Sequence, residues 1–483
     1  MSLSSHARPP SDTAPPDRRR PLIVLPLAFG LAFAVFSGLT GTGTMPREAA
    51  FMSGIFVLAA VLWVTEALPL FATSLLVIGL QIVLLANPGG WPGLGFATGT
   101  PPTYREILNA AADPVLLLFF GGFVLAHAAG KEGVDRAMSG LLLHPFGTQP
   151  RWVLLGLMLI TLLFSMWMSN TATTAMMLVL VTPMLAAMPA NEPFRKAIVL
   201  GVPFAANIGG MGTPIASPPN AVALGFLQKA GYHVAFLDWM LVAVPLVVGL
   251  AVFTWWLLVR LFAPATPGLR IAQPGETLTR RGWLVVAVFV VTAVMWMTDR
   301  WHGLPPSVVA LLPVLVLTAS GIFRREDLGR LEWNILILIA GGLSLGAGLQ
   351  LTGLDRIAVQ WLPAAGGSGL GLLAVLVLVT MGIGSFMSNT AAANLILPLG
   401  LSAAALADGS GGLSPVQAAL SIALAASLSM VLPVSTPPNA IAYARGEFTI
   451  RDMARVALPV GAVAAALIVA AGGTVMRFWG LVK

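Results

Sequence analysis

The chain has 483 residues, of which 57% are hydrophobic and 9% are charged, with a formal net charge of +7. Soluble domains carry about a quarter of their residues as charged side chains, so this composition excludes a soluble globular protein. Cysteine is absent, which excludes disulfides, thiolate metal sites and a cysteine nucleophile. Segments long enough to cross a bilayer as helices predict an all-α polytopic membrane protein.

The N-terminal region differs from the rest of the chain. Residues 1–20 are rich in proline, serine and arginine and predict a disordered tail. Arg18, Arg19 and Arg20 stand directly before the first apolar segment, and this basic cluster predicts a cytoplasmic N-terminus. The first transmembrane helix and its loop then occupy residues 21–50.

The remainder of the chain consists of two repeats. Residues 51–262 and 283–483 form the two halves, and a basic linker, 263–282, joins them. Ser-Asn-Thr occurs at 169–171 and again 219 residues later at 388–390, and a Pro-Pro-Asn motif recurs downstream with the same offset of 219. Matching motifs in one order at one offset indicate an internal duplication, a common architecture of membrane transporters.

Each half contains two apolar regions that are interrupted by polar residues or proline. Residues 152–188 and 369–407 are too long for one simple span and carry the Ser-Asn-Thr motifs at their centres, so they predict re-entrant hairpins. Residues 197–228 and 416–446 contain Pro-Pro pairs, which remove backbone donors and disfavour helix before them, so they predict broken helices.

The distribution of basic residues predicts the topology. If each hairpin enters and leaves on one side, the chain has about 11 transmembrane helices plus the two hairpins. On this count 19 of the 26 Lys and Arg residues are cytoplasmic and 7 are not, as the positive-inside rule requires. Each repeat then has an odd number of crossings, so the repeats are inverted. The linker is cytoplasmic, the C-terminus lies outside, and a bacterial inner membrane is the predicted location.

The Ser-Asn-Thr motifs predict a site for anions. Ser, Thr and Asn are favoured at helix N-termini, and a half-helix that begins within the membrane presents free N–H groups with partial positive charge. Such a tip binds an anion without Arg or Lys. Freed carbonyls at the Pro-Pro breaks can coordinate a small cation such as Na⁺. An alternative is that the motifs only cap and pack helices, because small polar residues also join helices within membranes.

Other functional classes have less support. Glu66 and Asp299 occupy corresponding places near membrane ends, and the adjoining loop residues favour an interfacial cap or ion pair over a proton relay. The sequence shows no catalytic triad and no phosphate-binding glycine loop, so neither an enzyme nor an ATP-driven pump is expected. A channel would require continuous polar stripes along its helices, whereas the polar residues here are clustered at the breaks.

The paired motifs resemble those of the divalent anion/sodium symporter family (DASS), which includes the INDY-type dicarboxylate transporters. The resemblance covers about residues 21–483, and "LPVSTPPNAIAYARG" (432–446) is similar to the family signature. It implies a homodimer that works by an elevator mechanism, a secondary active transporter importing dianions. The implied substrates are C4-dicarboxylates such as succinate, malate and fumarate, coupled to sodium. A sodium-independent exchanger, or a citrate or sulfate carrier of the same fold, remains open.

The resemblance also implies site residues. The substrate would contact Ser169, Asn170, Thr171, Ser217, Pro218, Ser388, Asn389, Thr390, Thr436 and Pro437. Sodium would use two groups, the first Ser165, Ser169, Asn170 and Ala216, the second Gly384, Ser388, Asn389 and Ser435. The sodium-coupled pattern has a hydroxyl residue where this chain has Gly384, so the second site is expected to lack one side-chain oxygen, and hard cations require several oxygens.

Overall fold

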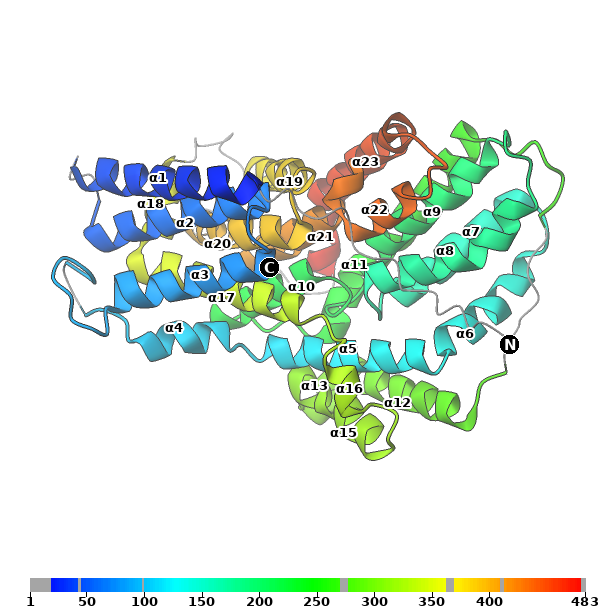
Figure 1. Cartoon of the computed structure of the whole chain (residues 1–483), viewed down its shortest axis with the longest axis horizontal. Helices are drawn as coiled ribbons and strands as arrows, with labels where there is room; N and C mark the ends of the chain where they lie inside the picture. The colour runs from blue at the N-terminus through cyan, green and yellow to red at the C-terminus, as the bar shows by residue number, and fades with distance from the viewer. Residues whose placement is uncertain are drawn as a thin grey trace, which may run out of the picture.

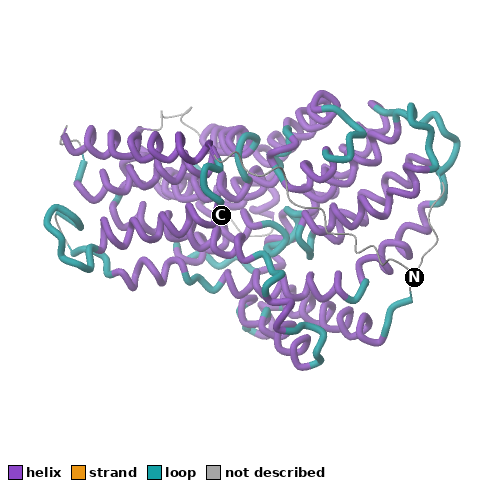
Figure 2. The backbone as a smooth tube through the Cα atoms, viewed as in Figure 1, coloured by secondary structure: helices purple, strands orange, loops and turns teal. Residues whose placement is uncertain are grey.

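The computed structural model describes residues 19–41, 45–97, 100–269, 277–361, 369–408 and 412–478. Every regular element within these residues is a helix (Figure 2). The expectations for the tail up to residue 18, for part of the linker and for the last five residues lie outside the described residues. The all-helical prediction is confirmed for the parts of the chain that the structure describes.

The first transmembrane helix and the first repeat contain the following elements: α1 (Arg19–Gly41), α2 (Arg47–Thr65), α3 (Leu70–Gln81), the π-helix η1 (Ile82–Ala86), α4 (Tyr104–Ala111), α5 (Val115–Lys131), α6 (Val134–Leu143), the 3-10 helix η2 (His144–Phe146), α7 (Pro150–Ser165), α8 (Asn170–Ala186), α9 (Phe194–Gly209), α10 (Pro218–Lys229) and α11 (Phe236–Leu261). Figure 1 shows α1 to α4 at one end of the molecule and α6 to α9 at the other.

The second repeat contains α12 (Arg280–Met297), α13 (Asp299–His302), α14 (Pro306–Val309), α15 (Leu311–Ala319), α16 (Arg325–Leu328), α17 (Trp333–Thr352), α18 (Leu354–Trp361), α19 (Gly369–Gly384), α20 (Asn389–Asp408), α21 (Pro415–Ser427), the 3-10 helix η3 (Pro433–Ser435), α22 (Pro437–Tyr443) and α23 (Ile450–Phe478). Helices α5 to α11 of the first repeat therefore have counterparts in helices α17 to α23 of the second repeat, in the same order along the chain.

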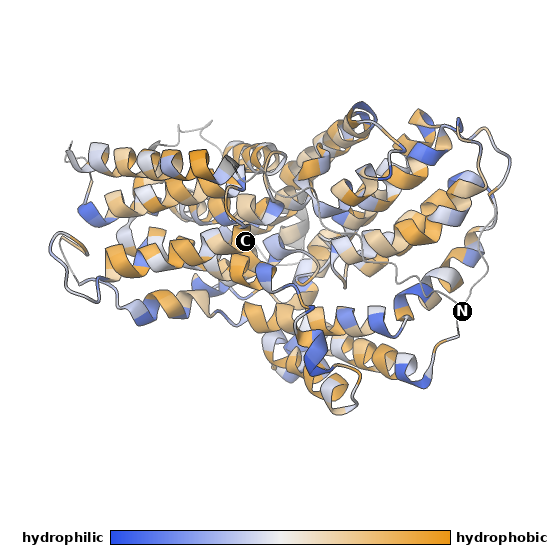
Figure 3. Ribbon diagram, viewed as in Figure 1, coloured by the Kyte–Doolittle hydropathy of each residue, from blue (hydrophilic) through white to orange (hydrophobic). Residues whose placement is uncertain are grey.

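Eight helical segments among the described residues are long and apolar enough to cross a membrane. They are Pro21–Gly41, Arg47–Thr65, Tyr104–Lys131, Phe236–Leu261, Arg280–Met297, Trp333–Thr352, Asn389–Leu406 and Ile450–Ala470. Shorter apolar helices, including α7, α8, α19 and α21, complete the bundle. Apolar residues dominate along the helices, and hydrophilic residues gather at many helix ends and connections (Figure 3). The chain is thus a polytopic membrane protein.

The two repeats interlock through equivalent contacts. Helix α17 packs against α3, while its counterpart α5 packs against α14 and α15. Helix α10 packs against α20 and α21, while its counterpart α22 packs against α8 and α9. The second part of each broken helix, α10 or α22, therefore packs against helices of the other repeat.

The helix breaks fall at the motifs because the local sequence stops each helix there. Helix α7 ends at Ser165 and α8 begins at Asn170, and likewise α19 ends at Gly384 and α20 begins at Asn389. In the broken helices α10 and α22, proline occupies the first helical position, where its missing N–H costs no hydrogen bond. The residues before these prolines are extended, with φ near −140°.

Candidate anion-binding site

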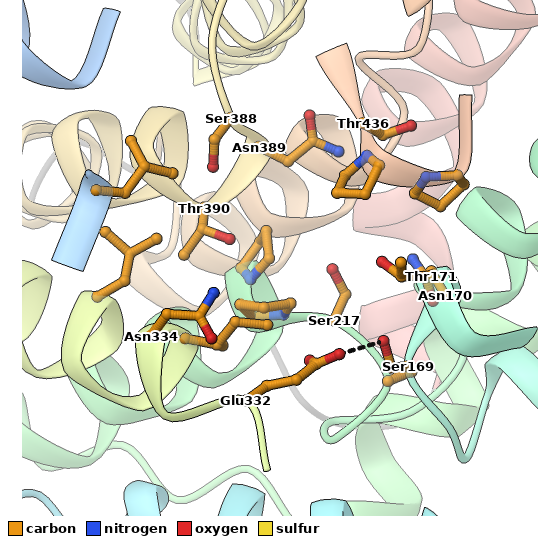
Figure 4. Close-up of a pocket in the computed structure, with 18 of the residues that line it drawn as sticks. Ser169, Asn170, Thr171, Ser217, Glu332, Asn334, Ser388, Asn389, Thr390 and Thr436 are labelled. Carbon is orange, nitrogen blue, oxygen red and sulfur yellow. Dashed lines mark hydrogen bonds between the residues drawn. The ribbon is translucent and has the colours of Figure 1, made fainter. Parts of the chain in front are cut away.

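A cavity of about 650 Å³ lies where the interrupted helices meet. All ten predicted substrate residues line it, and Figure 4 shows the two Ser-Asn-Thr motifs approaching it from different helices. None of the described residues that line the cavity is Lys, Arg or His. An anion held here would therefore depend on hydroxyls, amides and helix N-termini.

The predicted sodium residues divide into two groups. Ser165 and Gly384 are buried at the ends of α7 and α19 and are not among the residues that line the cavity. The other predicted sodium residues line the cavity itself: Ser169, Asn170, Ala216, Ser388, Asn389 and Ser435. The structure thus brings each sodium group together with one end of the predicted substrate site.

The two Ser-Asn-Thr tips differ in how their serines are used. The Ser388 hydroxyl accepts a hydrogen bond from the Ala391 amide at 3.5 Å and so caps α20. The Ser169 hydroxyl makes no capping bond to α8. It donates instead to the Glu332 carboxylate, Oγ to Oε1, at 3.0 Å (Figure 4). The first amides of α8 are therefore left without the side-chain cap that the corresponding serine provides in α20.

Three oxygens gather behind the first tip. The Ser165 hydroxyl lies 2.6 Å from Asn170 Oδ1 and 2.8 Å from the Ala206 carbonyl oxygen. One hydroxyl proton cannot satisfy both acceptors at once. A buried group of oxygens with fewer protons than acceptors has the ligand chemistry that hard cations prefer.

At the second tip, the space that corresponds to the Ser165 side chain is filled by a different residue. A Cβ at Gly384 would lie 2.5 Å from the Ser429 hydroxyl oxygen. Ser429 Oγ donates to the Ala425 carbonyl at 3.3 Å, and Ala425 corresponds to Ala206 at the offset of 219. In the first repeat the position equivalent to Ser429 is Gly210. The hydroxyl expected at residue 384 is therefore present in this region, supplied by Ser429.

Asn389 retains an unused acceptor. Its Oδ1 atom is buried and has no hydrogen-bond partner among the described residues, whereas the equivalent atom of Asn170 accepts a bond from Ser165. Buried polar atoms are nearly always paired, so an isolated one requires an explanation. A carbonyl oxygen that points to no donor is suited to bind a cation or a ligand proton.

The asparagines of the Pro-Pro-Asn motifs order the breaks in the helices. Asn220 donates through Nδ2 to the carbonyls of Gly210 and Thr213, at 2.9 and 2.8 Å. Asn439 donates through Nδ2 to the carbonyls of Met430 and Leu432, at 3.2 and 3.3 Å, and Leu432 corresponds to Thr213 while Met430 stands one position after the equivalent of Gly210. These buried amides replace backbone partners that the broken helices lack, which membrane segments require. Neither asparagine is among the residues that line the cavity.

One asparagine joins the two repeats across the site. Asn207, on α9, donates through Nδ2 to Thr436 Oγ1 at 3.2 Å and to Asn439 Oδ1 at 3.0 Å. The equivalent position in the second repeat is Ala426, which cannot form such a bond. Sequence reasoning missed Asn207, because its role depends on a contact between the repeats.

Two carboxylates line the cavity. Glu66 was expected to act as an interfacial cap or ion pair. It lines the cavity and forms no ion pair among the described residues, and its backbone is in the αL conformation at the end of α2. Asp299, its counterpart, does act as a cap and accepts the Phe236 amide at 3.1 Å. Glu332 was not predicted as a site residue. The sequence feature that could have identified it is its position as a carboxylate directly before the apolar segment of α17.

Comparison with known proteins identifies the family. The sequence profile described as "Citrate transporter" (CitMHS) matches residues 60–411 and 354–480. An uncharacterized transporter of Haemophilus influenzae is 31% identical over 458 residues, covering 90% of this chain and 93% of the relative. The sodium-dependent dicarboxylate transporter SdcS of Staphylococcus aureus is 28% identical over 492 residues, covering 93% of this chain and 89% of SdcS.

Two further comparisons concern length and fold. An uncharacterized transporter of Schizosaccharomyces pombe is 29% identical over 445 residues, and the aligned region spans only 50% of that relative's length. The crystal structure of the YdaH transporter of Alcanivorax borkumensis aligns with a TM-score of 0.56 at 14% identity, covering 87% of this chain and 98% of YdaH, which shows the fold alone. The family profile matches most of the chain, so this protein belongs to the citrate transporter family of membrane transporters, and its resemblance to the divalent anion/sodium symporters is confirmed.

Proposed function

We propose that this protein is a secondary active transporter that imports C4-dicarboxylates such as succinate, malate or fumarate, coupled to sodium. One observation carries the proposal: the helix tips of both repeats line one cavity that has no basic residue among its described lining. Two separate N-terminal tips suit an anion with a negative group at each end. The name of SdcS, a sodium-dependent dicarboxylate transporter, supports the same substrate class.

The residues present fit a role for sodium. At the first tip Ser165, Asn170 and the Ala206 carbonyl offer oxygens close together. At the second tip the free Asn389 Oδ1 atom and the Ser429 hydroxyl lie in the equivalent region. These groups would hold one Na⁺ at each tip, and the bound charge would favour a dianion between them. Because Ser429 is present, the glycine at position 384 is not by itself a reason to exclude the second sodium site.

The elevator mechanism is proposed from the arrangement of the helices. Helices α7 to α11 with α19 to α23 carry the tips, and we infer that they move as a transport domain against a scaffold of α1 to α5 and α12 to α17. We further infer inverted repeats, a homodimer and a bacterial inner membrane location, with the N-terminus cytoplasmic and the C-terminus outside. In this topology Glu66 and Glu332 both lie on the cytoplasmic side of the cavity.

A citrate carrier is the second candidate, because the matching family profile is described as a citrate transporter. Citrate would use the same tips with a third carboxylate in the remaining cavity volume. Neutral hydroxyls and amides also accommodate sulfate, and a sodium-independent exchanger would use the same anion site without the cation groups.

Uptake into proteoliposomes distinguishes these possibilities. Labelled succinate and labelled citrate should be offered separately, with an inward sodium gradient, without sodium, and with unlabelled succinate inside. We expect succinate uptake that requires the sodium gradient. Uptake that is independent of sodium and stimulated by internal succinate would contradict symport and establish exchange. Citrate uptake with no succinate uptake would overturn the C4-dicarboxylate assignment.

A further inference from the structure

The Glu332 carboxylate lies at one end of the anion site. Glu332 directly precedes α17, whereas Ser169 precedes α8, and the two residues meet only across the cavity (Figure 4). Oε1 accepts the Ser169 hydroxyl at 3.0 Å, and Oε2 is buried with no hydrogen-bond partner among the described residues. No positive side chain in the described lining of the cavity neutralises this group.

This position is the one that the proposed function assigns to a substrate carboxylate. Ser169 is the first residue of the Ser-Asn-Thr motif, and the free N–H groups at the start of α8 attract negative charge. In the second repeat the corresponding serine caps its own helix, and no carboxylate replaces the cap. At the offset of 219 the residue equivalent to Glu332 is Asp113, which does not line the cavity and instead accepts the Val115 amide at 3.0 Å and pairs with Lys229, so only one tip faces a carboxylate from this position.

We propose that Glu332 is a built-in competitor of the substrate, a tethered carboxylate that occupies the Ser169 tip when the carrier is empty. This inference rests on the proposed function. An incoming dianion displaces Glu332 from the Ser169 hydroxyl at that tip. It binds the Ser388 tip without competition from a carboxylate of the protein. Glu332 thus weakens substrate binding at one end of the site, and it takes the hydroxyl back when the substrate leaves.

Glu66 provides a matched control. It lines the same cavity and carries the same charge, but no hydrogen bond joins it to either tip in the described structure. Glu66→Gln therefore reports the effect of removing one negative charge from the cavity. Glu332→Gln removes the same charge and also replaces the hydrogen bond from Ser169 to a carboxylate with a weaker one to a neutral amide.

Calorimetric titration of the purified protein with succinate, at fixed sodium concentration, tests the proposal. A hydrogen bond to a charged group is stronger than one to a neutral group by an amount that corresponds to about tenfold in affinity. We expect Glu332→Gln to bind succinate about fivefold to tenfold more tightly than wild type, and Glu66→Gln less than about twofold more tightly. In a Ser169→Ala background, Glu332→Gln should have no larger effect than Glu66→Gln.

Three results would overturn the inference. Equal tightening by Glu332→Gln and Glu66→Gln would show that only the electric field of the cavity matters. Weaker binding in Glu332→Gln would show that Glu332 supports the site, for example by holding a cation. If wild type binds succinate and Glu332→Gln binds it equally well, the inference fails while the proposed function stands.

A second measurement needs no substrate and so remains decisive if wild type binds no succinate. The chain lacks cysteine, so Ser169→Cys introduces a single thiol at the tip. An anionic methanethiosulfonate reagent should label Ser169→Cys several times faster when Glu332→Gln is also present, and no faster with Glu66→Gln. Equal labelling rates in all three proteins would overturn the occupation of the tip by Glu332.

Discussion

The Ser429 hydroxyl lies over the α-carbon of Gly384, in the space that a side chain at residue 384 would need. In the first repeat the hydroxyl belongs to the helix before the tip, as Ser165, and the residue equivalent to Ser429 is Gly210. In the second repeat the two residue types have exchanged places. The pair Ser165 and Gly210 is therefore equivalent to the pair Gly384 and Ser429, with the hydroxyl moved from one helix to the other.

This exchange leads to a prediction for paired substitutions. Gly384→Ser alone should lower the melting temperature and sodium-dependent uptake, because its Cβ would crowd Ser429 at 2.5 Å. Ser429→Gly alone should weaken sodium activation by removing an oxygen. The double substitution recreates the arrangement of the first repeat and should restore both properties. Thermal melting and sodium-dependent succinate uptake measure this, and a double variant no better than the worse single variant would contradict it.

The tip asparagines should be essential for uptake. Asn170→Ala and Asn389→Ala each remove an amide that faces the cavity, and the loss of a hydrogen bond to a charged group corresponds to about a tenfold to hundredfold change. Initial rates of succinate uptake should fall by that factor while the protein stays monodisperse. Asn334→Ala is the matched control, since Asn334 lines the cavity outside both tips. Near-normal uptake in both tip variants would refute the site.

The proposed topology predicts opposite accessibility for two exposed threonines. Thr100 lies before α4 and Thr277 lies shortly before α12. In right-side-out vesicles, a membrane-impermeant thiol reagent should label Thr100→Cys but should reach Thr277→Cys only after the membrane is opened. The absence of native cysteine makes the wild-type chain the background control. If both cysteines were labelled from one side, the region 152–188 would have to cross the membrane as a single span.

An ion pair near the C-terminal end of α5 should contribute to stability. Asp327 is almost fully buried, which alone would raise its pKa, but bonds from Lys131, the Arg324 amide and His127 outweigh burial and hold the pKa below its usual range. A lowered folded-state pKa means that the stabilisation is present above the unfolded pKa of about 3.9 and is lost as pH falls further.

Asp327→Asn tests this interaction by thermal melting at different pH values. At pH 7 the variant should melt several degrees below wild type, because it leaves the Lys131 charge without its partner. The difference between the two proteins should shrink when the pH is lowered below about 4, because the unfolded wild-type chain then binds a proton at this carboxyl that the folded protein does not. A difference that stays constant from pH 7 to pH 3 would argue against the electrostatic origin.

Local sequence chemistry explains what could be predicted. The helix breaks follow from Ser, Thr and Asn at helix starts and from Pro218 and Pro437, which act on their immediate neighbours. The contact of Ser169 with Glu332 joins residues 163 positions apart, and no local pattern encodes it. The position of Ser429 over Gly384 likewise depends on how α19 packs against α21. The parts of the site that could not be predicted therefore depend on packing between segments that lie far apart in the sequence.

The bond from Asn207 to Thr436 and Asn439 has a consequence for the history of the chain. Ala426 stands where a second such bond would begin, so the two halves are now joined by a bridge that only one of them can build. Two copies of the second half would lack the bridge entirely. Two copies of the first half would carry this asparagine twice. The two halves are therefore no longer interchangeable at this bridge, since only the half that contains Asn207 supplies the donor.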